Sequence, residues 1–317
     1  MPANSLAQFC AKPKFQNTIN VTLNDSGVMG IFDGFKSMFE TKLNVDSRFE
    51  ILREAISGTM SSFYMARDKK SDEVVGLKIL DIEKTNHFES RFKGLDKPLE
   101  GEISSQFDHP LIVKTLDFGM TNKGEHYVLM EFLDGPGLNS LITDRSPLLE
   151  MNRISLIRQM VESVKIVHEA GYIHRDICPR NFICLNDATS LKLIDFGLTV
   201  PATNEFMQPG NRTGTPNYMA PEVVRRRATD QRLDIFSLGV TCYQMIALQL
   251  PWPGQDVTGK AAMSHDTKPP VPLTEVVSDV EPTLANAIMQ CLNREPAARP
   301  QSAEDLLRAI SMVRTGS

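Results

Sequence analysis

The chain has 317 residues, of which 41% are hydrophobic, and its formal net charge is −5. This length and composition predict a globular protein of one large or two modest domains with a substantial core. The weakly acidic balance argues against a broad basic surface for nucleic acid or membranes, and the basic run at residues 225–227 is expected to be a solvated face. We therefore expect no nucleic-acid partner.

Five cysteines are present, and they lack the paired spacing of a zinc site or a disulfide framework. This usage fits a reducing cytosol. No stretch approaches the roughly 18 uninterrupted apolar residues that a membrane span needs, and the N-terminus lacks the features of a signal peptide. We therefore predict a cytoplasmic protein without an integral membrane span.

An N-terminal extension is expected at residues 1–46, where the only regular pattern is one apolar helix face. We predict a short amphipathic helix that docks on the following domain, and a membrane-surface or partner-binding helix is the alternative. The apolar face consists of Val28, Ile31, Phe32, Phe35, Met38 and Phe39.

Short apolar runs between Phe49 and Leu80 predict consecutive antiparallel strands. The segments "HPLIVKTLDFG" and "EHYVLMEFL" predict two further strands, with "TNKG" as a hairpin turn.

Beyond "LDGPG" the periodicity becomes helical, most clearly in "NRISLIRQMVESVKIVHEAG", where Gly171 ends the helix. Short strands are expected at residues 182–195, and helices near 234–248, 283–292 and 302–313. The fold class is therefore α+β, with one domain at 47–314. Its small antiparallel β-rich lobe covers about 47–133, its helical lobe covers about 134–314, and a ligand cleft is expected between them.

Six motifs occur in this order: "ISGTMSSFYMAR", "VGLK", "YVLMEFLDG", "HRDICPRN", "DFG" and "GTPNYMAPE". Their order and spacing resemble the protein kinase family, most closely its bacterial Ser/Thr type, from about Phe49 to Met312. The resemblance implies a two-lobed kinase fold and a reaction that uses ATP and Mg²⁺.

The first motif lies where the family's glycine-rich loop covers the phosphates of ATP. The resemblance assigns this role to Ile56, Ser57 and Gly58, although only Gly58 of the family's three glycines is present. Backbone N–H groups can still reach phosphates where the side chains point away, so we expect functional phosphate cover. A plain hairpin is the alternative.

The resemblance also implies an adenine site. Phe63 and Gly76 occupy the positions of the family's valine and alanine over the ring, and the larger side chain opposite the smaller one keeps the volume similar. Backbone groups of Glu131 and Leu133 would bond adenine, and Met130 would border the back of the pocket. The remaining residue assigned to nucleotide binding is Ile183.

Lys78 matches the family's phosphate-binding lysine, and a glutamate on a following helix should hold it. Glu100 is the first candidate and Glu102 the second. Pro98 and Gly101 crowd this helix because both residue types disfavour helix interiors.

The "HRDICPRN" loop contains residues that the resemblance implies for the transfer of phosphate. Asp176 matches the base that orients the acceptor hydroxyl and takes its proton. Asn181 and Asp195 match the magnesium ligands, in keeping with the preference of Mg²⁺ for oxygen.

Cys178 stands where Ser/Thr kinases usually carry a lysine that touches the transferring phosphate. A neutral thiol cannot replace that charge, whereas the planar guanidinium of Arg180 two residues later can reach back to the phosphate. A surface arginine paired with an acidic neighbour is the alternative. Thr215 would hydrogen-bond Asp176 and favours Ser/Thr over tyrosine acceptors.

The segment after Asp195 contains Thr199, Thr203 and Thr213. We expect possible autophosphorylation at Thr203 or Thr213, because Arg175 could pair with a phosphothreonine and order the segment.

Three further residues match structural positions of the family. Glu222 and Arg299 match its buried ion pair, and Asp234 matches the aspartate that anchors the catalytic loop.

The function predicted from the sequence is an ATP-dependent Ser/Thr protein kinase acting on protein substrates. Two alternatives remain open. One is a pseudokinase that binds nucleotide or a partner and acts as a signalling scaffold, which the depleted glycine loop and Cys178 would favour. The other is a phosphotransferase that acts on a small molecule or on tyrosine.

Overall fold

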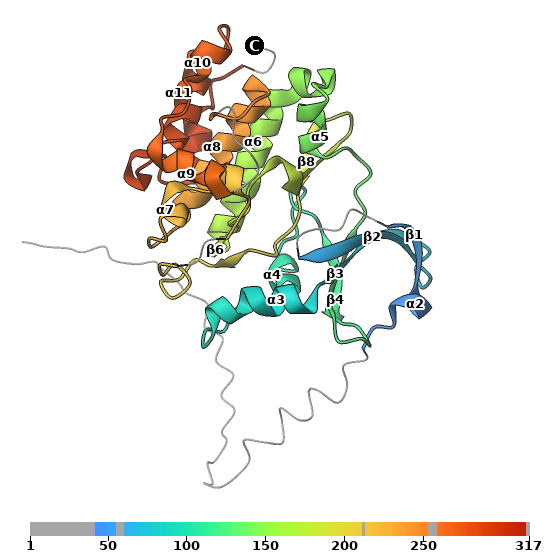
Figure 1. Ribbon diagram of the computed structural model, residues 1–317. Coiled ribbons are helices and arrows are strands. Elements are labelled where there is room, and N and C mark those ends of the chain that lie inside the picture. Colours follow the sequence, from blue (N-terminus) through green and yellow to red (C-terminus); the bar gives the residue numbers. More distant parts are fainter. Residues whose placement is uncertain (1–41, 55–59, 211–212, 253–258, 315–317) are drawn as a thin grey trace, which may run out of the picture. The chain divides into compact units, whose positions relative to one another are not determined.

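A five-stranded antiparallel sheet forms the first part of the described chain, with strand order β1-β2-β3-β5-β4 (Figure 1). The computed structural model describes residues 42–54, 60–210, 213–252 and 259–314. The apolar helix expected within residues 28–39 and the loop residues Ile56, Ser57 and Gly58 lie outside these ranges. The strands are β1 (Phe49–Glu54), β2 (Ser61–Asp68), β3 (Val74–Leu80), β4 (Thr115–Met120) and β5 (His126–Glu131), and the short helix α2 (Val45–Arg48) precedes them.

Alternation along the strands gives the sheet two different faces. On one face, Val75, Leu77 and Leu129 belong to a buried apolar cluster. On the other face, Lys78 of β3 lies opposite Phe63 of β2 and Val128 of β5. A one-residue change in register would exchange these faces, so the hydrophobic pattern of β3 determines where the Lys78 side chain points.

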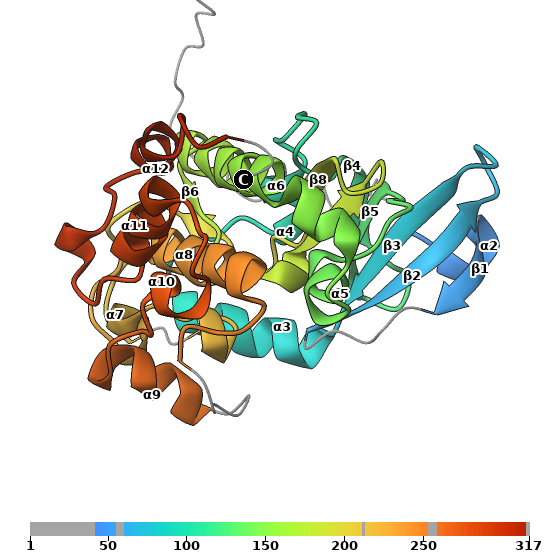
Figure 2. The same ribbon diagram turned by 90° about the horizontal axis from the view of Figure 1, so that it is seen from above.

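Three helical segments connect β3 to β4, and the first two were not predicted from the sequence. Asp81 caps α3 by accepting a hydrogen bond from the Lys84 N–H, a local signal that could have revealed this helix. Figure 2 shows α3 extending from the sheet toward the helical lobe. The segments are α3 (Ile82–Glu89), the 3₁₀ turn η1 (Ser90–Phe92) and α4 (Glu100–Ser104).

The second part of the described chain is mainly helical. Its longest helix, α6 (Pro147–Glu169), begins five residues before the predicted segment, because Ser146 caps it and Pro147 suits the first helical position. Gly171 has φ of 82° just after the helix, which explains the glycine there. The remaining helices are α5 (Leu138–Thr143), α7 (Pro221–Val224), α8 (Arg232–Ala247), α9 (Gly259–Thr267), α10 (Leu273–Val276), α11 (Pro282–Cys291) and α12 (Ala303–Ala309).

Short strands and 3₁₀ turns hold the loops of the helical lobe. Strands β7 and β8 pair antiparallel and frame the turn that precedes the "DFG" motif, while β6 pairs with β9. These elements are β6 (Tyr172–Ile173), η2 (Pro179–Asn181), β7 (Phe182–Leu185), β8 (Ser190–Leu193), β9 (Val200–Pro201), η3 (Pro216–Tyr218) and η4 (Pro296–Ala298).

The predicted two-lobed α+β class is confirmed: an antiparallel sheet precedes a helical lobe. The strand expected in "HPLIVKTLDFG" is only partly correct, because β4 begins at Thr115. Ile112 instead forms an isolated bridge with Leu193 of the helical lobe. Among the helices of the described ranges, none is both long and apolar enough to cross a membrane.

A buried ion pair connects α7 with the segment after α11. Both carboxylate oxygens of Glu222 accept hydrogen bonds from the Arg299 guanidinium, at 2.8 and 2.7 Å. The Arg299 side chain is 0% exposed and also donates to the backbone carbonyls of Asn293, Arg294 and Arg232. Removal of either charge would leave the other buried without its partner.

Arg299→Met should lower the free energy of unfolding by about 3 to 5 kcal/mol, because the Glu222 carboxylate loses its buried partner. Urea unfolding at neutral pH measures this change. Arg308→Met is the matched control, since the Arg308 side chain is 72% exposed and lies 3.7 Å from Asp305, and it should cost less than about 0.5 kcal/mol. Similar losses for both variants would contradict the expected role of the pair.

Candidate active site

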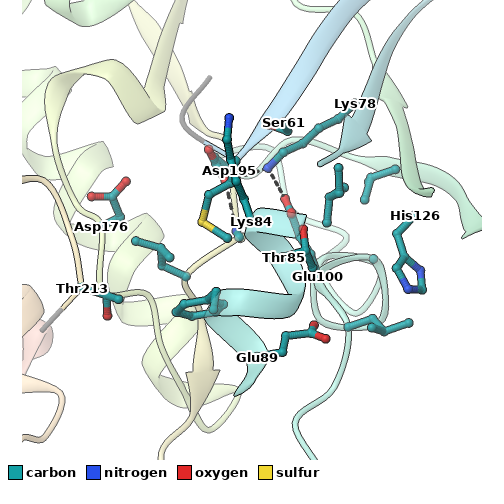
Figure 3. Close-up of a pocket in the computed structure, with 18 of the residues that line it drawn as sticks. Ser61, Lys78, Lys84, Thr85, Glu89, Glu100, His126, Asp176, Asp195 and Thr213 are labelled. Carbon is teal, nitrogen blue, oxygen red and sulfur yellow. Dashed lines mark hydrogen bonds and ion pairs between the residues drawn. The ribbon is translucent and has the colours of Figure 1, made fainter. Parts of the chain in front are cut away.

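One lysine ammonium lies between two carboxylates at the junction of the lobes (Figure 3). Lys78 Nζ is 2.6 Å from Glu100 Oε1 and 2.8 Å from Asp195 Oδ1. Lys78 lies on β3, Glu100 is the first residue of α4, and Asp195 follows β8. The Lys78 and Glu100 side chains are buried, whereas that of Asp195 is 43% exposed. Three segments distant in sequence therefore form one ion cluster.

The electrostatics of this cluster favour the ionised forms of Lys78 and Asp195, whereas burial raises the pKa of Glu100 above its ordinary value, against the opposing effect of the Lys78 ammonium. Burial alone would lower the pKa of Lys78, but the carboxylates of Asp195 and Glu100 raise it above its ordinary value. Burial alone would likewise raise the pKa of Asp195, but the Lys78 ammonium and the Gly197 N–H lower it to about 2. Both groups are therefore ionised at neutral pH.

The structure brings Glu100, and not Glu102, to the lysine. The Glu102 carboxylate instead accepts the Leu99 N–H at 2.7 Å and caps α4. Pro98 lies before the first helical residue, so it does not interrupt the helix. A Cβ at Gly101 would lie 2.4 Å from the Cβ of Phe118, so a residue without a side chain is needed for α4 to approach β4 this closely.

Asp234 anchors the backbone of the "HRDICPRN" loop. Its two carboxylate oxygens accept the backbone N–H groups of His174 and Arg175, each at 2.8 Å. His168 Nε2 lies 2.9 Å from the same carboxylate. Asp234 is fully buried, so these contacts fix the loop immediately before Asp176.

Asp176 is oriented by side chains from both sides of the loop. Its Oδ1 accepts the hydroxyl of Thr215 at 2.7 Å and the Thr215 N–H at 2.9 Å. Its Oδ2 accepts Nδ2 of Asn181 at 3.1 Å. Arg180 Nη2 in turn donates to the Thr215 hydroxyl at 3.2 Å. The predicted catalytic residues Asp176, Arg180 and Thr215 thus form one hydrogen-bonded chain.

Cys178 is a packing residue in this geometry. Its side chain is buried, with 1% exposure, and burial raises the pKa of its thiol to about 12. A neutral, buried thiol is a poor nucleophile and a poor target for oxidation. The exposed side chain of Arg180, by contrast, lines the cavity beside Asp176.

Asn181 and Asp195 have oxygen atoms suited to Mg²⁺. The amide nitrogen of Asn181 is engaged by the Asp176 carbonyl and carboxylate, which leaves its oxygen as a ligand. Asp195 uses Oδ1 for Lys78 and Gly197, which leaves Oδ2. Within the described ranges, no group of three or more His, Cys, Asp or Glu side chains could hold a metal. Mg²⁺ would thus depend on these two residues, water and phosphate oxygens.

The residues expected around adenine lie on β2, β3, β5 and β7, except Leu133, which follows β5. A Cβ at Gly76 would lie 2.8 Å from Cζ of Phe63 and 3.0 Å from Cγ of Met130, so the phenyl ring takes the space that a side chain at position 76 would need. Leu133 packs beside the buried cluster that contains Met130. The other two residues are Glu131, which ends β5, and the half-buried Ile183 of β7.

The three threonines of the segment after Asp195 differ in their surroundings. Thr199 is 0% exposed, which makes its hydroxyl inaccessible. Thr203 donates a hydrogen bond to the Glu205 carboxylate at 2.9 Å and is exposed. Thr213 accepts a hydrogen bond from Arg175 at 3.1 Å. Thr213 therefore lies beside the arginine that was expected to pair with a phosphothreonine.

Two contacts that the sequence did not reveal hold the segment after Thr215. His265 Nδ1 lies 2.8 Å from the Met219 carbonyl, so Nδ1 carries the proton. Ser237 of α8 donates to the Tyr218 carbonyl at 2.8 Å. Both partners are far away in sequence, so no local motif could have indicated them.

A cavity of about 680 Å³ is lined by Lys78, Glu100 and Asp195 of the ion cluster and by Asp176, Arg180 and Thr215. The residues expected around adenine are not among the described residues that line it. Figure 3 shows Asp176 and Thr213 on one side of it, His126 on the other, and Lys78, Asp195 and Glu100 between them. The cavity is thus lined by ionisable groups and by the segment that contains Thr215.

The chain belongs to the protein kinase family, because the protein kinase domain matches residues 49–309. It is 31% identical over 268 residues to the serine/threonine-protein kinase pkn3 of Myxococcus xanthus, which covers 81% of this chain and 48% of that protein. It is 28% identical to the serine/threonine-protein kinase PrkC of Bacillus subtilis, and this match covers 83% of this chain and 40% of that protein. It is 30% identical to the serine/threonine-protein kinase pkn2 of Myxococcus xanthus, and this match covers 85% of this chain and 33% of that protein. The chain therefore spans at most about half the length of these relatives.

Glu100→Gln should slow phosphate transfer about 10- to 100-fold, because a charged hydrogen bond to Lys78 contributes about 1.5 to 3 kcal/mol. Initial rates with labelled ATP measure the effect. Glu102→Gln is the matched control and should stay within about threefold, since Glu102 only caps α4. Equal losses would show that α4 as a whole, and not the ion pair, had been disturbed.

Proposed function

We propose that this chain is a Ser/Thr protein kinase that transfers the γ-phosphate of ATP to serine and threonine hydroxyls of protein substrates. One observation carries the proposal: the Lys78–Glu100–Asp195 ion cluster and the oriented carboxylate of Asp176 line the same cavity. A phosphate-binding cation and a hydroxyl-orienting base are the two groups that phosphoryl transfer needs at close quarters.

Each residue would have one task in the reaction. Lys78 would hold the α and β phosphates, and Glu100 would hold Lys78. Asp176 would orient the acceptor hydroxyl and accept its proton. Mg²⁺, held by Asn181 and Asp195, would neutralise charge on the phosphates. These residues mainly position the reacting groups and neutralise the charge of the phosphates. Positioning and charge neutralisation account for most of the catalysis of phosphoryl transfer.

The hydrogen bond from Thr215 to Asp176 supports Ser/Thr acceptors. The threonine side chain lies beside the carboxylate, where it takes up space that the ring of a tyrosine acceptor would need. The relatives named serine/threonine-protein kinases agree with this choice.

Asp176→Asn should reduce incorporation of label from γ-labelled ATP at least about 100-fold, because the base is lost with little change in shape. The assay uses the full chain, Mg²⁺ and a library of serine, threonine and tyrosine peptides, with products located by mass spectrometry. Asp187→Asn is the control, since Asp187 lies exposed in the turn between β7 and β8. Measurable ATP binding without label in wild type would instead support a pseudokinase, and label only on tyrosine would overturn the acceptor class.

We further propose Thr213 as the site of autophosphorylation, with Thr203 as the second candidate. The hydrogen bond from Arg175 to Thr213 supports this order, because a phosphate added to Thr213 would lie beside the Arg175 guanidinium and could pair with it. The mass spectra of the same experiment locate the modified threonine.

Arg180→Ala should lower kcat about tenfold or more, because the cation proposed to steady the transferred phosphate is lost. Arg226→Ala is the control, since Arg226 is an exposed arginine outside the cavity lining. Cys178→Lys in the Arg180→Ala background tests whether a cation at position 178 restores part of the rate. A rate for Arg180→Ala within about twofold of wild type, under roughly 0.5 kcal/mol of barrier, would exclude the proposed role.

A further inference from the structure

The segment that carries Thr215 has one half at the cavity and one half in the core. Residues 213–216 line the cavity beside Asp176, whereas residues 218–220 are buried. Thr215 contacts the Asp176 carboxylate through both its hydroxyl and its backbone N–H. Because the two halves are joined by a single residue, the position of the buried half determines where residues 213–216 lie relative to Asp176.

Two helices hold the buried half by its backbone carbonyls. Ser237 of α8 donates to the Tyr218 carbonyl, and His265 Nδ1 of α9 donates to the Met219 carbonyl, each at 2.8 Å. Ser237 and His265 are both 4% exposed. Helix α9 packs against η3 and α7, and Figure 2 shows α7 and α9 as neighbours. Hydrogen bonds to two consecutive carbonyls fix the orientation of the peptide groups between η3 and α7.

The imidazole of His265 is held in place by aromatic packing. Its ring centroid lies 4.2 Å from that of Trp252 and 5.6 Å from that of Phe236. Trp252 is itself fixed, because its Nε1 donates to the Lys268 carbonyl at 3.0 Å. Burial lowers the pKa of His265 to about 4, so the ring is neutral at pH 7 and carries one N–H. That proton lies on Nδ1, where the Met219 carbonyl accepts it.

The cavity half of the segment lies very close to the "HRDICPRN" loop. Gly214 has φ of 125°, and a Cβ at this position would lie 2.9 Å from the Arg175 carbonyl oxygen. The segment therefore has no room to approach the loop further. Loosening of its buried half would shift residues 214–216 away from the loop and change the space beside Asp176.

We propose that His265 is a positioning residue for the protein acceptor. Its hydrogen bond to the Met219 carbonyl keeps residues 213–216 where they contact the acceptor chain beside Asp176. His265 is not among the described residues that line the cavity, so it acts through the segment. Its loss should weaken binding of the acceptor and not of ATP, because the Lys78 cluster belongs to other elements. This role rests on the proposed function.

Two substitutions separate the hydrogen bond of His265 from its ring packing. His265→Phe keeps an aromatic ring beside Trp252 but has no donor. His265→Asn lacks the ring, but its Nδ2 is as many bonds from the backbone as Nδ1 of histidine. With a serine peptide as acceptor, His265→Phe should raise the KM for the peptide at least about fivefold, while kcat and the KM for ATP stay within about twofold. His265→Asn should keep the peptide KM within about twofold of wild type.

Thr267→Val is the matched control on the same helix. Thr267 is exposed and donates to the Met263 carbonyl inside α9, so this variant should keep wild-type constants within about twofold. His265→Leu is a second variant without a donor, which keeps the test valid if phenylalanine does not fit. A wild-type peptide KM in the folded donor-free variants would overturn the proposal. Equal rises in His265→Phe and His265→Asn, or equal changes in the peptide and ATP constants, would overturn it as well, because they would indicate ring packing or general damage.

Hydrogen exchange of the same proteins tests the positioning without any activity. The amide N–H groups of Tyr218 and Met219 bond to the carbonyls of Thr215 and Pro216. They should exchange at least about tenfold faster in His265→Phe than in wild type, and at the wild-type rate in Thr267→Val. Unchanged exchange in His265→Phe would overturn the proposal. Absence of phosphate transfer by the wild-type chain would count against the proposed kinase function, whereas the exchange rates would still decide whether His265 holds the segment.

Discussion

The ion cluster around Lys78 is the constraint on which the rest of the site depends. A buried ammonium is stable only where carboxylates compensate its loss of water, and both Glu100 and Asp195 do so within 2.8 Å. One carboxylate comes from α4 and the other from the loop after β8, so the cluster forms only when the two lobes have one particular arrangement. The same arrangement brings Asp176 to the cavity.

An aromatic contact extends this dependence to the segment after Asp195. Phe88 of α3 packs against Phe92 with 5.3 Å between the ring centroids, and Phe92 packs against Phe206 at 5.6 Å. All three rings are buried. The helices that lead to Glu100 therefore rest on the same segment that carries Thr213, so a change in that segment affects the ion cluster through packing as well as charge.

In the "HRDICPRN" loop, a neighbouring residue carries the positive charge that Cys178 lacks. Cys178 packs into the core, and the exposed cation lies two residues later at Arg180. Arg180 contacts Thr215, which contacts Asp176, so the cation and the carboxylate are ordered by one shared hydroxyl. A loop of this kind needs a fixed backbone, which the buried carboxylate of Asp234 supplies.

Local signals in the sequence predicted the antiparallel strands of the first lobe, the long helix that stops before Gly171 and the residue types of the "HRDICPRN" loop, because alternation, capping and motif spacing are local. The sequence left Glu100 and Glu102 as alternatives. The packing of α4 on the sheet decides between them, because the choice depends on how closely α4 approaches β4, and Gly101 against Phe118 permits that approach. This contact joins segments distant in sequence, so no local signal could reveal it.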